Sequence, residues 1–292
     1  IDDKASVLVI LEAVETLLTQ GFTPSRTVYL AFGHDEEVGG QKGAKVIANL
    51  LQARGIKLEF VLDEGGVIAE GVVDGIDAPV AVIGPGEKGI LSLKIAATGL
   101  GGHSSQPSEY TAAGLVARAV YRLEENPFPI DLFHLSQFIQ SLGNELPLVQ
   151  RVIFANTWLF EPFAHKLFAG NSMLLASSRT TTAPTMLKAS IKDNVLPIHA
   201  EAVVNFRILP GDSIQSVIAH VKSIIDDENI EIERYGFWSE PSKMASTKSY
   251  GYEQLSLSIA QVIPDENLLI VPRLVIGATD ARHFSQVSEN SY

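Results

Sequence analysis

Two adjacent glutamates, Glu36 and Glu37, follow an apolar run in the stretch YLAFGHDEEVGG, Tyr29 to Gly40. Neighbouring carboxylates repel each other unless a positive charge lies between them or one of them holds a proton. A divalent cation offsets this repulsion, so that one glutamate can ligate the metal while the other takes a proton from the attacking water. The pair therefore predicts metal-assisted hydrolysis. A solvated acidic loop remains the alternative, because clusters of charge usually lie on the surface.

Two further acidic positions lie at the ends of expected elements. Asp2, in IDDK, opens a helix, and Asp63, in LDEGG, ends a strand. Each has a plain structural explanation, because aspartate is a common helix N-cap and a common turn residue before glycine. Three acidic ends in one α/β unit nevertheless form a pattern, since ligands bind at the carboxyl ends of parallel strands.

The elements that position these acids are expected in the order helix 5–20, strand 26–32, helix 42–53 and strand 58–66. This alternation predicts a parallel α/β sheet. From Leu91 the pattern changes to a β-α-β-β-α-β order, which predicts an inserted α+β unit of the ferredoxin-like kind. Helix 252–262 and strand 268–271 then return to α/β.

We therefore expect the α/β fold class and two domains. The first is a catalytic domain with a mixed sheet flanked by helices, formed by residues 1–91 and 241–292. The second is the inserted α+β domain, residues 92–240.

Composition limits the class of protein further. The chain has 292 residues, of which 46% are hydrophobic and 19% charged, so it can form a packed core. The net charge of −12 argues against nucleic acid as a partner. The absence of cysteine excludes thiolate metal sites and disulfides, and it leaves the compartment open. No apolar run is long enough to span a bilayer. Because the chain begins at Ile1, inside a motif, we expect a fragment that lacks residues at both ends.

Five motifs occur in the order IDDKAS, FGHDEEVGG, LDEGG, GEKG and GGHSSQP. Together they resemble the M20 family of zinc metallopeptidases, over essentially the whole chain. The segment SSRTTTAPTMLKASIKDNVLPIHAEAVVNFRILPGDS is similar to the branch of carboxypeptidase S and the N-fatty-acyl-amino-acid hydrolases in particular. The resemblance implies two zinc ions in the complete active site. It implies Asp2 as the bridging ligand, Glu36 as general base, Glu37 as the ligand beside it and Asp63 as a terminal ligand.

The family pattern also includes two histidine ligands that this chain does not match. One lies upstream of the DDK motif and the other near the C-terminus, so three of five protein ligands are expected here. His283 lies inside GATDARHF, where the pattern places no ligand, and a structural role is favoured for it. His34 is interpreted as a polar loop residue, with support of a metal ligand as the alternative.

The inserted domain is expected to bind substrate and to dimerise. His103, in GGHSSQP, reads as a turn histidine, and the resemblance implies that it stabilises the oxyanion in a partner subunit's active site. Arg207 lies among apolar residues, where an unpaired charge is costly, so it requires an anion from the protein or from a substrate. The resemblance favours a clamp of Asn194 and Arg207 on the substrate's free carboxylate, with Arg179 in the same pocket.

The resemblance thus implies a zinc hydrolase that cleaves N-acyl amino acids or short peptides with a free C-terminal carboxylate. The alternative is a non-catalytic homologue or inactive fragment that binds carboxylate ligands or only dimerises. The apolar stretch 127–169 is an acyl-chain wall, a dimer interface or plain core, and these three interpretations stay open. The family leaves a secreted or a vacuolar and lysosomal compartment open, and both hydrolysis and condensation.

Overall fold

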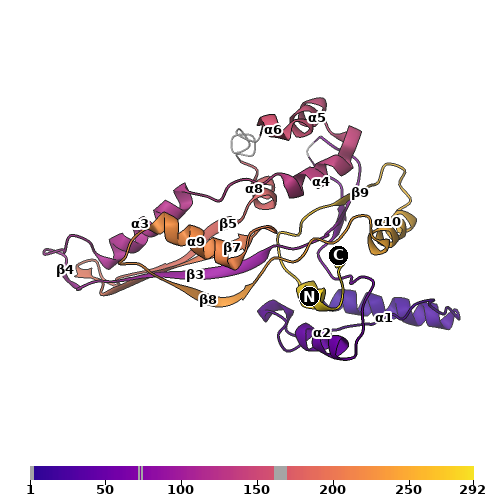
Figure 1. The fold of residues 1–292 in the computed structure, drawn as a ribbon, viewed down its shortest axis with the longest axis horizontal. Helices are drawn as coiled ribbons and strands as arrows, with labels where there is room; N and C mark the ends of the chain where they lie inside the picture. The colour runs from indigo at the N-terminus through magenta and orange to yellow at the C-terminus, as the bar shows by residue number, and fades with distance from the viewer. Residues whose placement is uncertain (1–2, 72, 74, 161–169) are drawn as a thin grey trace.

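A four-stranded antiparallel sheet forms one end of the elongated molecule (Figure 1). The structure is a computed structural model that describes residues 3–71, 73, 75–160 and 170–292. The strand order is β5-β7-β3-β8. The strands are β3 (Gly89–Thr98), β5 (Thr181–Lys188), β7 (His199–Ile208) and β8 (Glu231–Ser239).

Two helices, α3 (Ala112–Glu125) and α9 (Ile214–Ile225), pack on this sheet. Apolar residues alternate along β3, so that Leu91 and Ile95 pack with Val217 of α9 in one core. The four sheet strands and the two helices on the sheet follow one another as β3-α3-β5-β7-α9-β8, which is the predicted β-α-β-β-α-β order, although further helices lie between α3 and β5. A short pair, β4 (Gly102–His103) and β6 (Val195–Leu196), extends from the far end of the sheet (Figure 1).

A second, three-stranded sheet lies near the middle of the molecule (Figure 1). Strand β2 pairs in parallel with β9 and antiparallel with β1. Val80 and Val271 of this sheet share a core with Leu135 and Phe138 of α4. The elements of this part are β1 (Val67–Ala69), β2 (Val80–Ile83), α4 (Phe133–Leu142), η2 (Gly143–Glu145), α5 (Leu148–Ala155), α6 (Thr157–Phe160), α8 (Ser172–Ser178), α10 (Tyr250–Val262) and β9 (Leu269–Pro272).

The remaining elements carry the acidic motifs. Helix α2 packs against η4 through Ala44, Ala48 and Phe284. Helix α1, in contrast, buries none of its residues, and its apolar side chains are exposed. The elements are α1 (Lys4–Thr19), η1 (Glu36–Val38), α2 (Ala44–Ala53) and η4 (Asp280–Gln286).

Two predicted strands are corrected by the structure. Residues 26–32 form no strand, because no described segment pairs with them, and Val28 and Tyr29 are exposed. The predicted strand 58–66 is reduced to one parallel bridge, between Val61 and Ser291. The expected parallel sheet of the N-terminal part is therefore absent from the described residues. Strand β5 lies just before residues 189–209, the range in which both middle strands of the inserted unit were expected.

The packing of segment 133–154 crosses the predicted boundary between the two domains. This segment shares a core with β2 and β9, although the predicted bounds 92–240 would assign it to the inserted domain. The division into 1–91 with 241–292 and 92–240, and the role of the latter as lid and dimerisation domain, stay predictions. Within the described residues, no helix combines the length and apolar character needed to cross a bilayer.

Candidate active site

Asp35 holds together the loop that carries the two glutamates. Its two carboxylate oxygens accept hydrogen bonds from the backbone N–H groups of Lys42 and Gly43, each at 2.8 Å. The bond from Lys42 is the main reason why the pKa of Asp35 is lowered. The loop is thus closed at its base, and Glu36 and Glu37 begin the short helix η1 directly after the anchor.

The glycine pair after η1 lets another element approach closely. Gly40 has a φ of +64°, and a Cβ there would collide with Asp280 Oδ1 of η4. Gly39 has a φ of +101°, and its carbonyl oxygen lies 2.9 Å from His283 Nε2. His283 therefore ties η4 to the glycine pair. Its place in the structure agrees with the structural role favoured for it.

Glu36 belongs to a cluster of carboxylates. Burial raises the pKa of Glu36, and the cation Arg282 opposes this rise. The negative charges of Asp280, Glu37 and Asp63 raise the pKa further. The pKa of Asp280 is raised as well, first by burial, and Arg282 again opposes the rise. The structure thus brings the predicted base Glu36 and the predicted ligand Asp63 into one electrostatic neighbourhood.

The chemistry of this cluster fits a divalent cation. Carboxylate oxygens are ligands for hard and borderline cations, and a cation would relieve their repulsion. Asp280 Oδ1 is buried without a hydrogen-bond partner in the described part of the chain. Among the described residues, however, no three histidine, aspartate or glutamate side chains are grouped so that they could hold a metal ion. The predicted bridging ligand Asp2 lies outside the described residues, so a complete coordination shell needs further ligands.

Glu87, in the GEKG motif, is hydrogen-bonded to the residue that precedes Asp280 of the cluster. It is only 7% exposed, and it accepts hydrogen bonds from the backbone N–H of Thr279, at 3.1 Å, and from the Thr279 hydroxyl. Burial raises the pKa of Glu87 despite these bonds. Glu87 therefore fixes the residue that caps η4, directly before Asp280.

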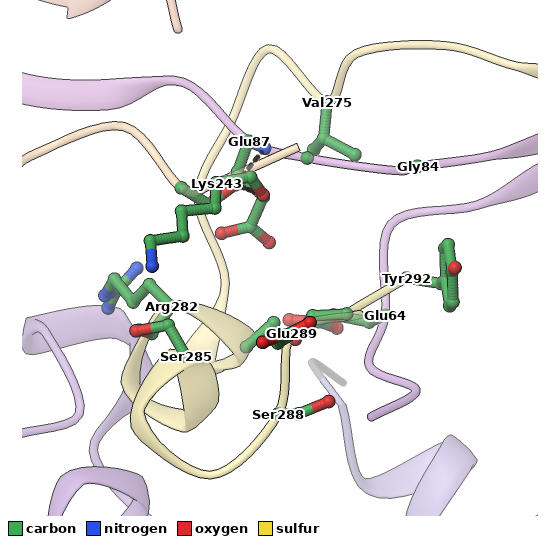
Figure 2. A pocket seen from close by; sticks show the side chains of 14 residues that line it. Glu64, Gly84, Glu87, Lys243, Val275, Arg282, Ser285, Ser288, Glu289 and Tyr292 are labelled. Atoms are coloured by element: carbon green, nitrogen blue, oxygen red, sulfur yellow. Dashed lines mark hydrogen bonds between the residues drawn. The ribbon is translucent and has the colours of Figure 1, made fainter. Parts of the chain in front are cut away.

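A small hollow lies beside Glu87. Figure 2 shows the nitrogen ends of Lys243 and Arg282 on one side of it, with Glu289 on another. Its volume is about 30 Å³, which is room for roughly two water molecules. The hollow is too small for a peptide or an acyl amino acid.

Three cations gather on the other side of the GEKG motif. Lys88 is 1% exposed, and its Nζ donates hydrogen bonds to the backbone oxygens of Ala176 and Arg179, at 2.8 and 2.7 Å. Burial lowers the pKa of Lys88 to about 7, and the charges of Arg207 and Arg179 act in the same direction, against Asp212. Burial also lowers the pKa of both arginines. The structure therefore places the two predicted substrate-binding arginines around one buried lysine.

No carboxylate forms an ion pair with Arg179 or Arg207 within the described residues. Arg207 lies on β7, between Thr181 and Ile90 of the neighbouring strands. A half-buried guanidinium without an anion is unfavourable, so this arrangement is suited to an incoming carboxylate.

His103 and Asn194 lie together at the far tip of the sheet. Strand β4 pairs His103 with Val195, and the Ser104 N–H donates to the Asn194 carbonyl at 3.1 Å. His103 is exposed, and its Nδ1 lies 2.8 Å from Ser105 Oγ. The side-chain Oδ1 of Asn194 is buried and unpaired in the part that the structure describes. Figure 1 shows β4 at one end of the molecule, well away from α2, which packs against η4.

The structure thus groups the predicted residues in three places. Glu36, Glu37 and Asp63 belong to the acidic cluster, Arg179 and Arg207 to the cationic cluster, and His103 with Asn194 to the tip. Sequence reasoning assigned no role to Asp280, Glu87 or Lys88. The signal for the last two was a charged pair between glycines in GEKG, a context that favours buried charge next to tightly packed backbone.

Comparison with known proteins identifies the class. The sequence matches peptidase family M20/M25/M40 over residues 1–291, and the chain belongs to this family.

Among individual relatives, "Probable carboxypeptidase S-like 2" of Dictyostelium discoideum is 41% identical over 293 residues. The alignment covers 100% of this chain and 56% of that protein. The human "N-fatty-acyl-amino acid synthase/hydrolase PM20D1" is 38% identical over 296 residues, with 100% and 58% coverage. The chain therefore spans somewhat more than half the length of these relatives.

Solved structures support the fold. The aminopeptidase PepT from Bacillus cereus superposes with a TM-score of 0.60 at 15% identity, covering 99% of this chain and 62% of that one. The M20 family metallo-carboxypeptidase Sso-CP2 from Sulfolobus solfataricus gives 0.53 at 18% identity, covering 85% and 68%. At these identities the likeness concerns the fold alone.

Proposed function

We propose that the complete protein is a metal-dependent hydrolase of the carboxypeptidase and aminoacylase type. It cleaves the amide bond of N-acyl amino acids or short peptides that carry a free C-terminal carboxylate. The observation that carries this proposal is that two consecutive residues, Glu87 and Lys88, connect the acidic cluster with the cationic cluster. Glu87 supports the acidic cluster through Thr279, and Lys88 is surrounded by Arg179 and Arg207. An acidic site for hydrolysis and a cationic site for an anion are thereby linked by one short, buried segment.

The substrate's carboxylate is bound by Arg207 and Arg179 in this proposal. Their guanidinium groups are half-buried, and they form no ion pair with a described carboxylate, so an anionic substrate completes their environment. Asn194 completes the clamp by donating a hydrogen bond from its side-chain NH₂ group to the carboxylate, which can only accept. Because it lies at the tip of the sheet with His103, both act on the active site of a second subunit, and the inserted domain mediates the dimer.

Glu36 is the general base. Its raised pKa favours proton uptake, so it can take a proton from the attacking water and return it to the leaving nitrogen. Asp2, Glu37 and Asp63 are the residues that would hold a divalent metal, for which we propose two zinc ions. When bound, the metal supplies a Lewis acid for the substrate carbonyl and lowers the pKa of water. His103 donates a hydrogen bond to the oxyanion that forms in the partner's site.

The substitution Glu36→Gln tests the central role. We expect turnover by the full-length, zinc-loaded protein to fall by roughly 10²–10⁴-fold, while its zinc content, measured by elemental analysis, stays the same. Glu124→Gln, on the exposed face of α3, is the matched control and should leave both unchanged. Full activity of Glu36→Gln, or loss of its zinc, would contradict the assignment.

The substrate class is tested by offering a hydrophobic dipeptide and a long-chain N-acyl amino acid to the same preparation. Release of the free amino acid from either one supports the proposed hydrolase, and the preferred one names the class. If neither is turned over, the non-catalytic alternative is favoured.

A further inference from the structure

A second cavity lies between α4, α5, α8 and the end of β9, apart from the acidic cluster. Its volume is about 310 Å³, roughly twice that of an engineered apolar cavity that stays dry and binds benzene. Most of the wall is aliphatic or aromatic, including Leu135, Phe138, Ile139, Leu142, Phe154 and Leu174. A cavity of this size and lining is typical of a site for a small apolar ligand.

One cation, Arg273, lines this apolar cavity. Its guanidinium contacts the Met173 sulfur, and its Cζ lies 6.0 Å from the centre of the Phe138 ring. No carboxylate of the described residues pairs with it. A half-buried cation in apolar surroundings is unfavourable without an anion, so the site calls for a ligand with a negative group.

A second polar side chain of the cavity, His134, has one ring nitrogen without a hydrogen-bond partner in the described part of the chain. His134 is 8% exposed, and its Nε2 lies 2.9 Å from the Pro210 carbonyl oxygen, to which it donates a hydrogen bond. In the neutral ring Nδ1 then carries a lone pair, and Nδ1 is buried without a partner in the described part of the chain. His134 and Phe138 are four residues apart on α4, so they lie one above the other on the same helix face. His134 is therefore on the helix face that also meets Arg273.

We propose that this cavity binds a linear apolar chain that ends in a carboxylate. The carboxylate pairs with Arg273, and the chain extends along the α4 face from Phe138 to Leu142. Free fatty acids and N-acyl amino acids share this chemistry, and the amide N–H of an N-acyl amino acid would also satisfy His134 Nδ1.

The site is separate from the acidic cluster. Arg273 and Leu274 line this cavity, whereas Val275 lines the small hollow beside Glu87. Binding there needs neither turnover nor a metal, so the inference stands or falls independently of the proposed hydrolysis.

Calorimetric titration of the 292-residue chain tests the head group. The probes are octanoate, N-octanoylglycine and 1-octanol, which has the chain without the charge. In Arg273→Gln we expect the Kd for octanoate to rise about tenfold, the loss typical of one hydrogen-bonded charge, and the Kd for 1-octanol to stay the same. Arg54→Gln, at the exposed end of α2, is the control and should bind all three probes as before.

Filling the cavity tests the location. Ile139→Trp should abolish binding of all three probes, whereas Ile191→Trp, on a fully exposed loop, should leave binding intact. Circular dichroism checks that each variant is folded. Tighter binding of N-octanoylglycine than of octanoate identifies the amide as the ligand, and the reverse identifies the free acid.

Absence of binding to the native chain would overturn the inference. Undiminished octanoate binding in folded Ile139→Trp would also overturn it, because the probe would then be held elsewhere, for example on the exposed apolar side chains of α1. Unchanged octanoate affinity in Arg273→Gln would do the same, and this variant keeps the test decisive if Ile139→Trp does not fold.

Discussion

Arg207 shows how a single residue connects the fold with the proposed chemistry. It lies near the end of β7, at a position that is paired with Ile90 on one side and Thr181 on the other, so its backbone is fixed. Its charge is half-buried beside Lys88 and Arg179, and like charges close together favour the binding of an anion. The sheet thereby holds a guanidinium in place before any substrate arrives, which reduces the entropy lost on binding.

Substitution of Arg207 by methionine tests this role in the full-length enzyme. We expect kcat/KM for a substrate with a free carboxylate to fall by about 10–100-fold, because a charge-assisted hydrogen bond is lost while the apolar stem remains. The same substrate with its carboxylate amidated should show little change between the native enzyme and the variant. Steady-state kinetics on this substrate pair is the measurement. Equal losses on both substrates would indicate a structural role.

Elements are brought together at the acidic cluster by small residues. Gly40 lies against Asp280, and Gly33 also approaches the Asp280 carboxylate, with a Cβ there lying 2.7 Å from Oδ2. These contacts let η4 sit directly on the glutamate loop. The close approach of the Asp280 side chain to the backbone of the glutamate loop therefore helps to define the geometry of the cluster.

Two glycine substitutions separate the effect of the positive φ at Gly40 from the effect of its close contact with Asp280. Gly55 has a φ of +68°, almost that of Gly40, but open space surrounds its missing Cβ. We expect Gly55→Ala to lower the free energy of unfolding by about 1–2 kcal/mol, from backbone strain alone. Gly40→Ala should lose a further ~1–3 kcal/mol, because the new methyl group collides with Asp280. Urea denaturation measures both, and equal losses would contradict the packing argument.

The sequence predicted helices α1, α2 and α10 and the β-α-β-β-α-β order well, because these depend on local periodicity. It predicted the strand 26–32 wrongly, since an apolar run such as RTVYLAF forms a strand only where a neighbour supplies hydrogen bonds. At the site, Glu36 and Asp63 were identified from charge at the ends of apolar runs; in the structure the charge of Asp63 raises the pKa of Glu36, and their roles stay predictions. Asp280 was not identified from the sequence, because its place in the cluster depends on packing against glycines that are far away in the chain.

At the scale of the whole molecule, Lys88 joins two parts of the fold. It precedes β3 of the large sheet, and its amino group binds the carbonyls of Ala176 and Arg179 at the end of α8. The helices around the β2-β9 sheet are thus fastened to the four-stranded sheet through one buried amine.

The stability of the molecule should therefore depend on pH through Lys88. Its pKa is about 7 in the folded chain, well below the ordinary value of 10.5. Between these values the unfolded chain binds the proton and the folded chain does not, so the free energy of unfolding rises as the pH rises from 7. We expect a contribution of up to about 1.4 kcal/mol per pH unit from pH 7 to 9.

Lys88→Met removes this contribution, so the difference in stability between native and variant chains should grow with pH over the same range. Urea denaturation at pH 7, 8 and 9 measures it, with Lys57→Met, at an exposed position, as the control. A difference that does not change with pH would show that Lys88 keeps its ordinary pKa.

The pairing of segment 58–63 with segment 287–292 has a consequence for the order of folding. Asp63 donates its N–H to the Tyr292 carbonyl at 2.8 Å, and Val61 exchanges bonds with Asn290 and Tyr292. These partners lie far apart in the sequence, so a growing polypeptide holds Asp63 without these neighbours until segment 287–292 has been made. During translation the four-stranded sheet can form first, whereas the carboxylates gather only once segment 287–292 is present. A nascent chain that has not yet reached segment 287–292 would therefore carry a folded four-stranded sheet beside an unassembled acidic cluster.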